Sequence, residues 1–329
     1  MLADSFGRIA TDLRVSVTDR CNLRCTYCMP AEGLDWLRGP AMLTDDEISR
    51  LISVAIRLLG ITEVRFTGGE PLIRRGLPAI IARTAALEPR PEISLTTNGI
   101  GLARLAGQLA AAGLDRLNVS LDTLSRQTFI TLTRRDRLPD VMQGLAAAAD
   151  AGLTPVKVNA VLMRGVNDHE ACALLRFCLD RGYQLRFIEQ MPLDAQHGWR
   201  RADMVTAGEI LTDLSAEFTL IPDDAGTRGS APAETFQINS GPDRVGIIGS
   251  VTRPFCGSCD RVRLTADGQI RNCLFAAAET DLRTALRSGA SDDQIAALWR
   301  TAVATKLPGH GISDPGFLQP ARPMSAIGG

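Results

Sequence analysis

The chain has 329 residues, of which 45% are hydrophobic, and a formal net charge of -1. This length allows one large domain or two modest ones around a substantial core, and the near-neutral charge gives no general attraction to nucleic acid or acidic membranes. No signal peptide and no apolar run of about 18 residues is present. We therefore expect a cytoplasmic protein, without nucleic-acid or membrane partners, in a compartment that keeps thiols reduced.

Strand-like and helix-like segments alternate between residues 13 and 191. The strand candidates are residues 13–18, 63–68, 92–98, 116–121, 155–162 and 184–191. Between the first two, residues 44–60 show helical periodicity, with Thr44 and Glu47 at capping-box spacing and Gly60 at the end. Such serial strand–helix units predict a parallel sheet covered by helices, either a barrel or a doubly wound sheet.

The strand ends distinguish these two folds. Most strands end in polar or glycine residues, at 18–20, 67–70, 96–98, 120–122 and 189–191. In a parallel barrel the carboxyl ends converge on one mouth, where active sites form, whereas a doubly wound sheet concentrates such residues at one switch point. We therefore predict an α/β fold, with an incomplete TIM-type (βα)6 barrel over residues 1–200.

Residues 201–329 have a different character, and we expect a smaller antiparallel C-terminal extension packed against the barrel. Two hairpins are predicted at 235–251 and 261–275, around the turn signals Gly-Pro-Asp and Ala-Asp-Gly. Two helices follow, at 279–288 and 291–305, and then a tail rich in proline and glycine. A tail of this kind is ordinarily a frayed end.

Six of the eight cysteines form two triplets, namely Cys21, Cys25 and Cys28, and Cys256, Cys259 and Cys273. The other two, Cys172 and Cys178, lie in a helical pattern and are expected to be small buried hydrophobic residues.

The first triplet, with Cys-x3-Cys-x2-Cys spacing, follows the first predicted strand. It lacks the fourth ligand of a closed zinc site, and its spacing differs from that of ferredoxins. If the three thiolates hold three irons of a [4Fe–4S] cluster, the fourth iron is open to a ligand and is a reaction site. A zinc site completed from elsewhere in the chain is the alternative.

The second triplet has the same deficit. Cys256 and Cys259 lie in a tight turn, and Cys273 follows after thirteen residues, on the return strand of the predicted hairpin. A zinc ribbon would normally show a second Cys-x2-Cys pair. A zinc knuckle completed by His310 is the alternative to an open cluster.

Arginines accompany the second triplet. Arg261 and Arg263 are two apart on one predicted strand and therefore share a face, with Val262 opposite. Arg271 is expected to approach Cys273 from the facing strand. Guanidinium groups beside an open iron predict a polyanion such as a triphosphate, whereas a solvated basic edge strand is the alternative, most of all for Arg271.

Three further cations, Arg14, Arg65 and Lys157, lie within predicted barrel strands. A cation in such a strand must face the mouth, because burial without a partner is costly. Lys157 and Lys306 are the only lysines among the 36 Lys and Arg residues, and a compact, flexible ammonium at 157 fits a binding site.

Two segments, "CNLRCTYC" at 21–28 and "FTGGEP" at 66–71, resemble the motifs of the radical S-adenosylmethionine superfamily. The resemblance implies that the open iron of the first cluster holds S-adenosylmethionine, which the reduced cluster cleaves to methionine and a 5′-deoxyadenosyl radical. The cofactor contacts that it implies are Tyr27, Gly69, Glu70, Ser120 and Met191.

Nearly the whole chain resembles the molybdenum-cofactor biosynthesis protein A family, the GTP 3′,8-cyclases, which are radical lyases. The matching segments run in order from "LRVSVTDRCNLRCTYCMP" through "TTNG", "NVSLD", "VKVNAVLMRGVND" and "RFIEQMP" to the terminal Gly-Gly. The resemblance implies two [4Fe–4S] clusters and a reaction in which loss of the 3′ hydrogen of GTP leads to (8S)-3′,8-cyclo-7,8-dihydroguanosine 5′-triphosphate. It implies GTP contacts at Arg14, Arg65, Thr96, Lys157, Arg261, Val262 and Arg263, and a catalytic tail at Gly328 and Gly329.

The same resemblance implies two functional partners: cyclic pyranopterin monophosphate synthase downstream, and an electron donor such as flavodoxin or ferredoxin. Association into a homodimer is left open. Two features depart from the family pattern. Asp260 stands where asparagine is common, and is expected to tune the second cluster, while "APAETF" at 231–236 puts one phosphate contact in doubt.

Two other functions are weighed against this one. A peptide-modifying radical enzyme would also carry an auxiliary cluster, but such enzymes usually have more C-terminal cysteines and lack the Arg-x-Arg between them. A zinc-stabilised RNA-binding protein would also use cysteine triplets. The neutral charge, the near-absence of lysine and the presence of only two tyrosines argue against it.

Overall fold

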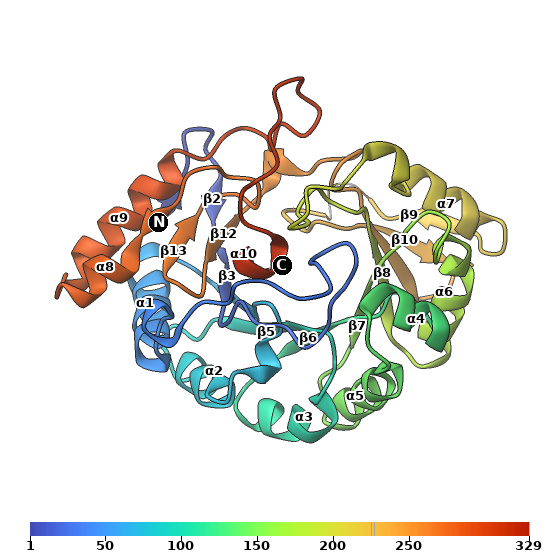
Figure 1. Ribbon diagram of the computed structural model, residues 1–329, viewed down its shortest axis with the longest axis horizontal. Coiled ribbons are helices and arrows are strands. Elements are labelled where there is room, and N and C mark those ends of the chain that lie inside the picture. Colours follow the sequence, from blue (N-terminus) through green and yellow to red (C-terminus); the bar gives the residue numbers. More distant parts are fainter. Residues whose placement is uncertain (225, 227, 329) are drawn as a thin grey trace.

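The computed structural model describes residues 1–224, 226 and 228–328. A curved sheet forms its centre, and helices cover the outer face of that sheet (Figure 1). Its central strands are β3 (Asp12–Ser16), β4 (Glu63–Thr67), β5 (Glu92–Thr97), β6 (Arg116–Ser120), β7 (Lys157–Val161) and β8 (Gln184–Ile188). These six strands pair in sequence order and in parallel, which confirms the predicted incomplete barrel.

The helices of this region connect consecutive strands. They are α1 (Asp45–Leu59), α2 (Leu77–Ala85), α3 (Leu102–Ala111), α4 (Arg126–Thr133), α5 (Leu138–Asp150) and α6 (Ala171–Asp180). The capping box predicted at Thr44 and Glu47 starts α1, and Gly60 ends it with a φ of 82°. Cys178 is buried on α6 as expected, whereas Cys172 is only partly buried.

The C-terminal part extends the same sheet at both edges. At the β8 edge lie β11 (Arg244–Ile248), β10 (Glu234–Ile238) and β9 (Leu220–Pro222), and at the β3 edge lie β12 (Arg261–Leu264), β13 (Gln269–Arg271) and β14 (Thr280–Asp281). Both predicted hairpins form. The extension is not purely antiparallel, however, because β11 pairs in parallel with β8 and β12 with β3.

The remaining elements complete the outer layer and the two ends of the chain. They are β1 (Leu2–Ala3), β2 (Ile9–Ala10), α7 (Ala207–Ser215), α8 (Leu282–Arg287), α9 (Asp292–Ala304) and α10 (Met324–Ile327). The C-terminal end lies at the centre of the view, over the strands (Figure 1). The domain boundary at residue 200 stays a prediction.

The two faces of the sheet differ in polarity because side chains alternate along each strand. On β3 and β4, the side chains of Leu13, Val15, Val64 and Phe66 are fully buried in the core, and each stabilises the fold by about 1.5–3 kcal/mol. Their neighbours in sequence face the concave side, which is polar. Within the described residues, no helix is long and apolar enough to cross a membrane.

Candidate active site

A cavity of about 830 Å³ occupies the concave side of the sheet. It collects most of the residues singled out in the sequence, namely Arg14, Cys21, Cys25, Tyr27, Cys28, Arg65, Gly69, Glu70, Thr96, Ser120, Lys157, Met191, Cys256, Cys259, Arg261, Arg263 and Cys273. Val262 is different: its side chain is buried in the hydrophobic core, so only its backbone could meet a ligand. Gly329 lies outside the described residues.

The first cysteine triplet lies on the loop after β3, and its three thiols are free. Burial raises the pKa of Cys21 to about 11 and that of Cys28 to about 12, and it raises the pKa of Cys25 well above its ordinary value. Negative charge on neighbouring thiols adds to the effect at Cys25 and Cys28. Three crowded thiolates require a cationic centre, so this donor set fits an iron–sulfur cluster.

Two glycines let the loop approach β4 closely. The Gly69 N–H donates to the carbonyl of Thr18 at 2.7 Å, and a Cβ at Gly69 would lie only 2.3 Å from the carbonyl oxygen of Arg20. Gly68 has a φ of 159°, and a Cβ there would lie 2.5 Å from the Thr18 carbonyl oxygen. The Gly-Gly pair is therefore required by backbone packing against the loop, and the Gly69 carbonyl is the group that could meet a cofactor.

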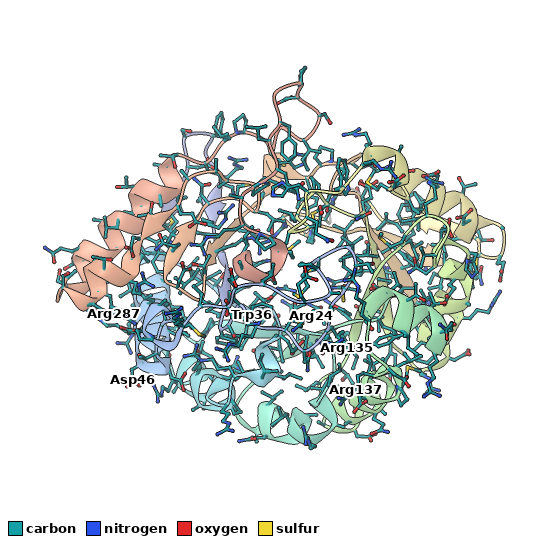
Figure 2. The ribbon with its side chains drawn as sticks, viewed as in Figure 1. Arg24, Trp36, Asp46, Arg135, Arg137 and Arg287 are labelled. Carbon is teal, nitrogen blue, oxygen red and sulfur yellow. The ribbon has the colours of Figure 1, made fainter. Side chains whose placement is uncertain are left out.

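An arginine holds the loop in shape from within. The Arg24 guanidinium donates to the carbonyls of Cys21 and Leu23 at 2.8 Å each, and lies over the ring of Trp36 at 5.5 Å (Figure 2). Asn98, at the end of β5, directs its amide toward the Cys21 sulfur at 3.7 Å. These contacts fix the orientation of the first ligand before any metal binds.

Two buried carboxyl groups border the predicted cofactor site. The Tyr27 hydroxyl donates to Asp122 at 2.7 Å, and burial raises the pKa of Asp122 to about 6. Burial also raises the pKa of Glu70 to about 7, although Glu70 accepts hydrogen bonds from the Thr97 hydroxyl and the Asn98 N–H. Glu70 thus joins the glycine loop to β5. Asp122 was not among the predicted site residues, because its hydrogen-bond partner, Tyr27, is distant in sequence.

Arginines from three adjacent strands form a row across the cavity. Arg263 on β12 pairs in register with Arg14 on β3, which pairs with Arg65 on β4. Burial, followed by the charge of Arg14, lowers the pKa of both Arg65 and Arg263 to about 9. Asp12 lies among them, 3.6 Å from Arg14 and 3.8 Å from Arg261.

Two further cations line the same cavity from strands β7 and β8. Lys157 lies on β7, and burial and the nearby Arg186 lower its pKa to about 7. Arg186 itself, on β8, also lines the cavity and has a pKa lowered to about 10 by burial. Sequence analysis missed Arg186, although it alternates with the buried Leu185 and Phe187. The excess of buried positive charge fits a polyanionic ligand.

The second triplet lies where the chain crosses from β11 to β12. Cys256 and Cys259 flank a short 3-10 turn, and Cys273 lies two residues beyond β13 rather than on it, as had been predicted. The predictions for Arg271 are also wrong. Arg271 lies on β13, the strand that leads to Cys273, and not on the facing strand. Its side chain is buried and pairs with Glu279. Arg271 therefore neither lines the cavity nor forms a solvated edge cation.

Lys306 contacts this triplet, and its role was missed. Its buried ammonium donates to the Cys259 carbonyl at 2.9 Å, the Arg261 carbonyl at 3.0 Å and the Cys259 sulfur at 3.4 Å. Burial disfavours the Cys259 thiolate, but the charges of Arg261 and Lys306 outweigh it, and the pKa of Cys259 is lowered. The only signal in the sequence was the rarity of lysine.

The zinc alternatives do not fit the geometry. Both ring nitrogens of His310 are engaged, since Nδ1 accepts from the Ile312 N–H at 3.1 Å and Nε2 lies 2.9 Å from the Ser250 carbonyl. In the described part of the chain, no three Cys, His, Asp or Glu side chains converge closely enough to hold a single metal ion. The thiolates of an iron–sulfur cluster each bind a different iron, so they need not converge on a single ion.

The two departures from the family pattern both border the cavity. Asp260 accepts a hydrogen bond from the Thr11 hydroxyl at 3.0 Å and lies 3.9 Å from Arg261. Beside residues 231–236, Arg228 pairs with Glu234 at 3.2 Å and lies over the ring of Phe255. The family pattern usually has a Pro-Ala-Arg-aromatic stretch where this chain has residues 231–236, and Arg228 supplies a guanidinium close to that segment.

The C-terminal tail reaches this site. Gly328 has a φ of 90°, and its carbonyl accepts a hydrogen bond from the buried Arg263 guanidinium. A Cβ at Gly328 would lie 2.9 Å from Cβ of Ser16, so the backbone conformation and the space both require glycine. The tail is therefore packed against the floor of the cavity rather than frayed.

Comparisons with known proteins agree with this geometry. Residues 15–178 match the radical SAM superfamily, and residues 183–312 match the Molybdenum Cofactor Synthesis C family. A GTP 3′,8-cyclase of Streptomyces coelicolor is 67% identical over 100% of this chain and 96% of its own length. GTP 3′,8-cyclase 2 of Mycobacterium tuberculosis is 61% identical over 100% of this chain and 92% of its own length.

Solved structures share the fold at much lower identity. SuiB of Streptococcus suis bound to S-adenosylmethionine superimposes with a TM-score of 0.62 at 12% identity, covering 89% of this chain and 68% of its own. At that identity, the likeness supports the barrel architecture alone.

Proposed function

Because this chain belongs to the GTP 3′,8-cyclase family of the radical S-adenosylmethionine superfamily, we propose that the cavity on the concave side of its sheet is the site where GTP is cyclised. The chain catalyses the first step of molybdenum cofactor biosynthesis, with S-adenosylmethionine and two [4Fe–4S] clusters as cofactors. One observation carries the assignment of the site: both cysteine triplets line a single cavity together with a row of buried and half-buried arginines.

The first triplet holds the cluster that binds S-adenosylmethionine in this proposal. When bound, the cluster and S-adenosylmethionine together would supply a 5′-deoxyadenosyl radical, which would remove the 3′ hydrogen of GTP so that the ribose carbon could bond to C8 of guanine. The chain orients the cofactor from several strand ends, with Tyr27, Gly69, Ser120 and Met191 all lining the cavity. Asp122 fixes the Tyr27 ring through its hydroxyl.

The triphosphate of GTP lies against the buried cations in this proposal. Arg14, Arg65 and Arg263 form one side of the site, and Lys157 and Arg186 form the other. Phosphate oxygens are stronger acceptors than any neutral group, and a guanidinium can bind them with two donors. Because both groups of cations hold the triphosphate, the ribose is fixed between the two cysteine triplets. Its 3′ carbon then faces the first triplet.

The guanine base points toward the second triplet in this proposal, because a cluster held only by Cys256, Cys259 and Cys273 would leave one iron without a thiolate and open to the base. Lys306 and Arg261 compensate negative charge at Cys259, and Phe255 presents its ring to the same cavity. The tail, through Gly328, covers the floor beside Arg263 and excludes water from the reacting atoms.

Partners beyond GTP belong to the proposal as well. An electron donor such as flavodoxin or ferredoxin would reduce the first cluster, and cyclic pyranopterin monophosphate synthase would consume the product. The cytoplasmic location and a homodimer stay predictions.

Position-specific labelling tests the proposed reaction directly. The anaerobically reconstituted enzyme is given S-adenosylmethionine with GTP deuterated at C3′ or, as the matched control, at C2′. We expect deuterium in the 5′-deoxyadenosine from the C3′ label only. Transfer from C2′, or from neither position, would contradict the proposed placement of the substrate.

A further inference from the structure

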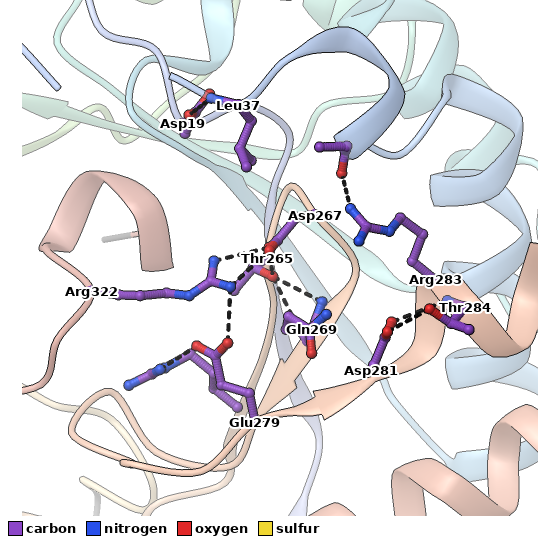
Figure 3. Close-up of polar contacts among 12 residues, drawn as sticks. Asp19, Leu37, Thr265, Asp267, Gln269, Glu279, Asp281, Arg283, Thr284 and Arg322 are labelled. Carbon is purple, nitrogen blue, oxygen red and sulfur yellow. Dashed lines mark hydrogen bonds and ion pairs between the residues drawn. The ribbon is translucent and has the colours of Figure 1, made fainter. Parts of the chain in front are cut away.

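The C-terminal segment, residues 322–328, is attached to the second-triplet hairpin by one arginine. The Arg322 guanidinium binds both carboxylate oxygens of Asp267, at 3.0 and 2.7 Å, and also reaches Glu279 at 2.9 Å. Asp267 lies in the turn between β12 and β13, and Glu279 lies just before β14 (Figure 3). Arg322 thus joins the start of the tail to this hairpin, while Arg263 of the same hairpin binds the Gly328 carbonyl at its far end.

The network around Arg322 is largely shielded from solvent. The side chains of Asp267 and Glu279 are 11% and 18% exposed, and Glu279 also pairs with Arg271, which is 3% exposed. Thr265 donates to Asp267 at 2.5 Å and fixes the orientation of that carboxylate. Burial raises the pKa of Asp267, but Arg322 and Thr265 outweigh it, so the carboxylate stays charged. Shielded, bidentate pairs of this kind are stronger than exposed ones.

Few other contacts fix the residues that follow Arg322, among them the hydrogen bond from the Met324 N–H to the Leu193 carbonyl at 2.9 Å. The helix α10 has only four residues, which is too short to be stable in isolation. The tail lies against both ends of the site. Within α10 the backbone N–H of Ser325 favours the charged form of the Cys28 thiol, and beyond the helix the Gly328 carbonyl accepts from Arg263. The tail therefore bridges the two triplets, provided that something fixes where it begins.

We propose that Arg322 is a positioning residue that holds the tail in the active site by binding Asp267 and Glu279. Because Asp267 lies in the turn of the second-triplet hairpin and Glu279 lies just before β14, which pairs with that hairpin, the start of the tail keeps a fixed position relative to the second triplet. The consequence for catalysis rests on the proposed function, whereas the attachment of the tail does not. Loss of Arg322 releases residues 323–328 while leaving the cysteines and the barrel intact.

Hydrogen–deuterium exchange on the reconstituted holoenzyme tests the attachment. In Arg322→Ala we expect the amides of 323–328 to exchange about tenfold faster or more, since charged hydrogen bonds of this kind contribute about 1.5–3 kcal/mol each. Arg283→Ala is the matched control: Arg283 donates to the Ala41 carbonyl and does not touch the tail (Figure 3). Unchanged protection of the tail in Arg322→Ala would overturn the proposal.

Kinetics test the consequence. We expect Arg322→Ala to lower kcat at least tenfold with unchanged iron content. Arg322→Lys keeps the positive charge but should recover only part of the loss, because an ammonium cannot bind both carboxylate oxygens in parallel. If Arg322→Ala fails to fold, Asp267→Asn removes the same charge pair with little change of shape and should give the same result. A released tail with unchanged kcat would overturn the positioning role, whereas a wild-type enzyme inactive on GTP would count against the proposed function instead.

Discussion

The ammonium of Lys306 donates a hydrogen bond to the sulfur of Cys259 at 3.4 Å, and the two residues are 47 positions apart in the chain. Lys306 is buried, and its other two hydrogen bonds fix the carbonyls of Cys259 and Arg261. A compact group with three donors satisfies these three acceptors at once. One lysine therefore fixes both a predicted cluster ligand and the start of the strand that carries Arg263.

This contact leads to a prediction for the second cluster. A positive charge beside a ligand sulfur stabilises the more negative, reduced form, so Lys306→Met should lower the midpoint potential of that cluster. A tenfold change in the one-electron equilibrium corresponds to about 59 mV. Redox titration followed by electron paramagnetic resonance measures it, with the first cluster as internal control and Lys306→Arg as the charge-retaining variant. An unchanged potential in Lys306→Met would contradict the assigned role.

Removal of one thiol tests the first triplet. Cys25→Ala should abolish 5′-deoxyadenosine formation and remove about half of the bound iron, because an open cluster cannot lose a further ligand and persist. Cys172→Ala is the control, since Cys172 lies on α6 with its sulfur 3.4 Å from the Asp213 carbonyl, away from the cavity. Cleavage of the cofactor by Cys25→Ala at the wild-type rate would exclude this loop from the chemistry.

Arg263 tests the triphosphate site. Arg263→Ala should weaken GTP binding about ten- to hundredfold, as expected from about 1.5–3 kcal/mol per charged hydrogen bond. Equilibrium binding without turnover measures this, and iron content shows whether the clusters remain. Arg137→Ala is the matched control, because Arg137 pairs with Asp140 on an exposed part of the surface. GTP affinity equal to that of the wild type would move the triphosphate elsewhere.

We expect Lys157 to make GTP binding depend on pH. Burial and Arg186 lower its pKa to about 7 in the free enzyme, and a bound triphosphate would raise it. Above the free-state pKa, binding then takes up a proton, so between about pH 7.5 and 9 the affinity should fall by up to tenfold per pH unit. Calorimetry in buffers of different ionisation enthalpy counts the protons. Lys157→Met should flatten this dependence, and a wild-type profile already flat would contradict it.

The chemistry-bearing motifs were readable from the sequence because each is local. The spacing of Cys21, Cys25 and Cys28, the Gly-Gly after β4 and the alternation around Arg14 all depend on neighbours in the chain. The six central strands follow for the same reason, since a period of two and regular helical connections are short-range patterns.

Other features depend on distant partners and could not be predicted. Nothing local distinguishes Lys306 or Arg322 from solvated cations, because their acceptors lie far away in sequence. Turn signals in the sequence indicate hairpins, but they do not indicate which strand joins which edge of the sheet. The parallel pairing of β11 with β8 and of β12 with β3 was therefore not predicted. Arg271 was misassigned because Glu279, its partner, follows after an irregular turn.

One anaerobic measurement tests the central claim most directly. The chain is reconstituted with iron and sulfide, both are quantified, and 5′-deoxyadenosine is measured with S-adenosylmethionine in the presence and absence of GTP. Two clusters require about eight irons per chain, and we expect cofactor cleavage to depend on GTP. Zinc in place of iron, or cleavage indifferent to GTP, would contradict a site in which both triplets and the buried cations act on one nucleotide.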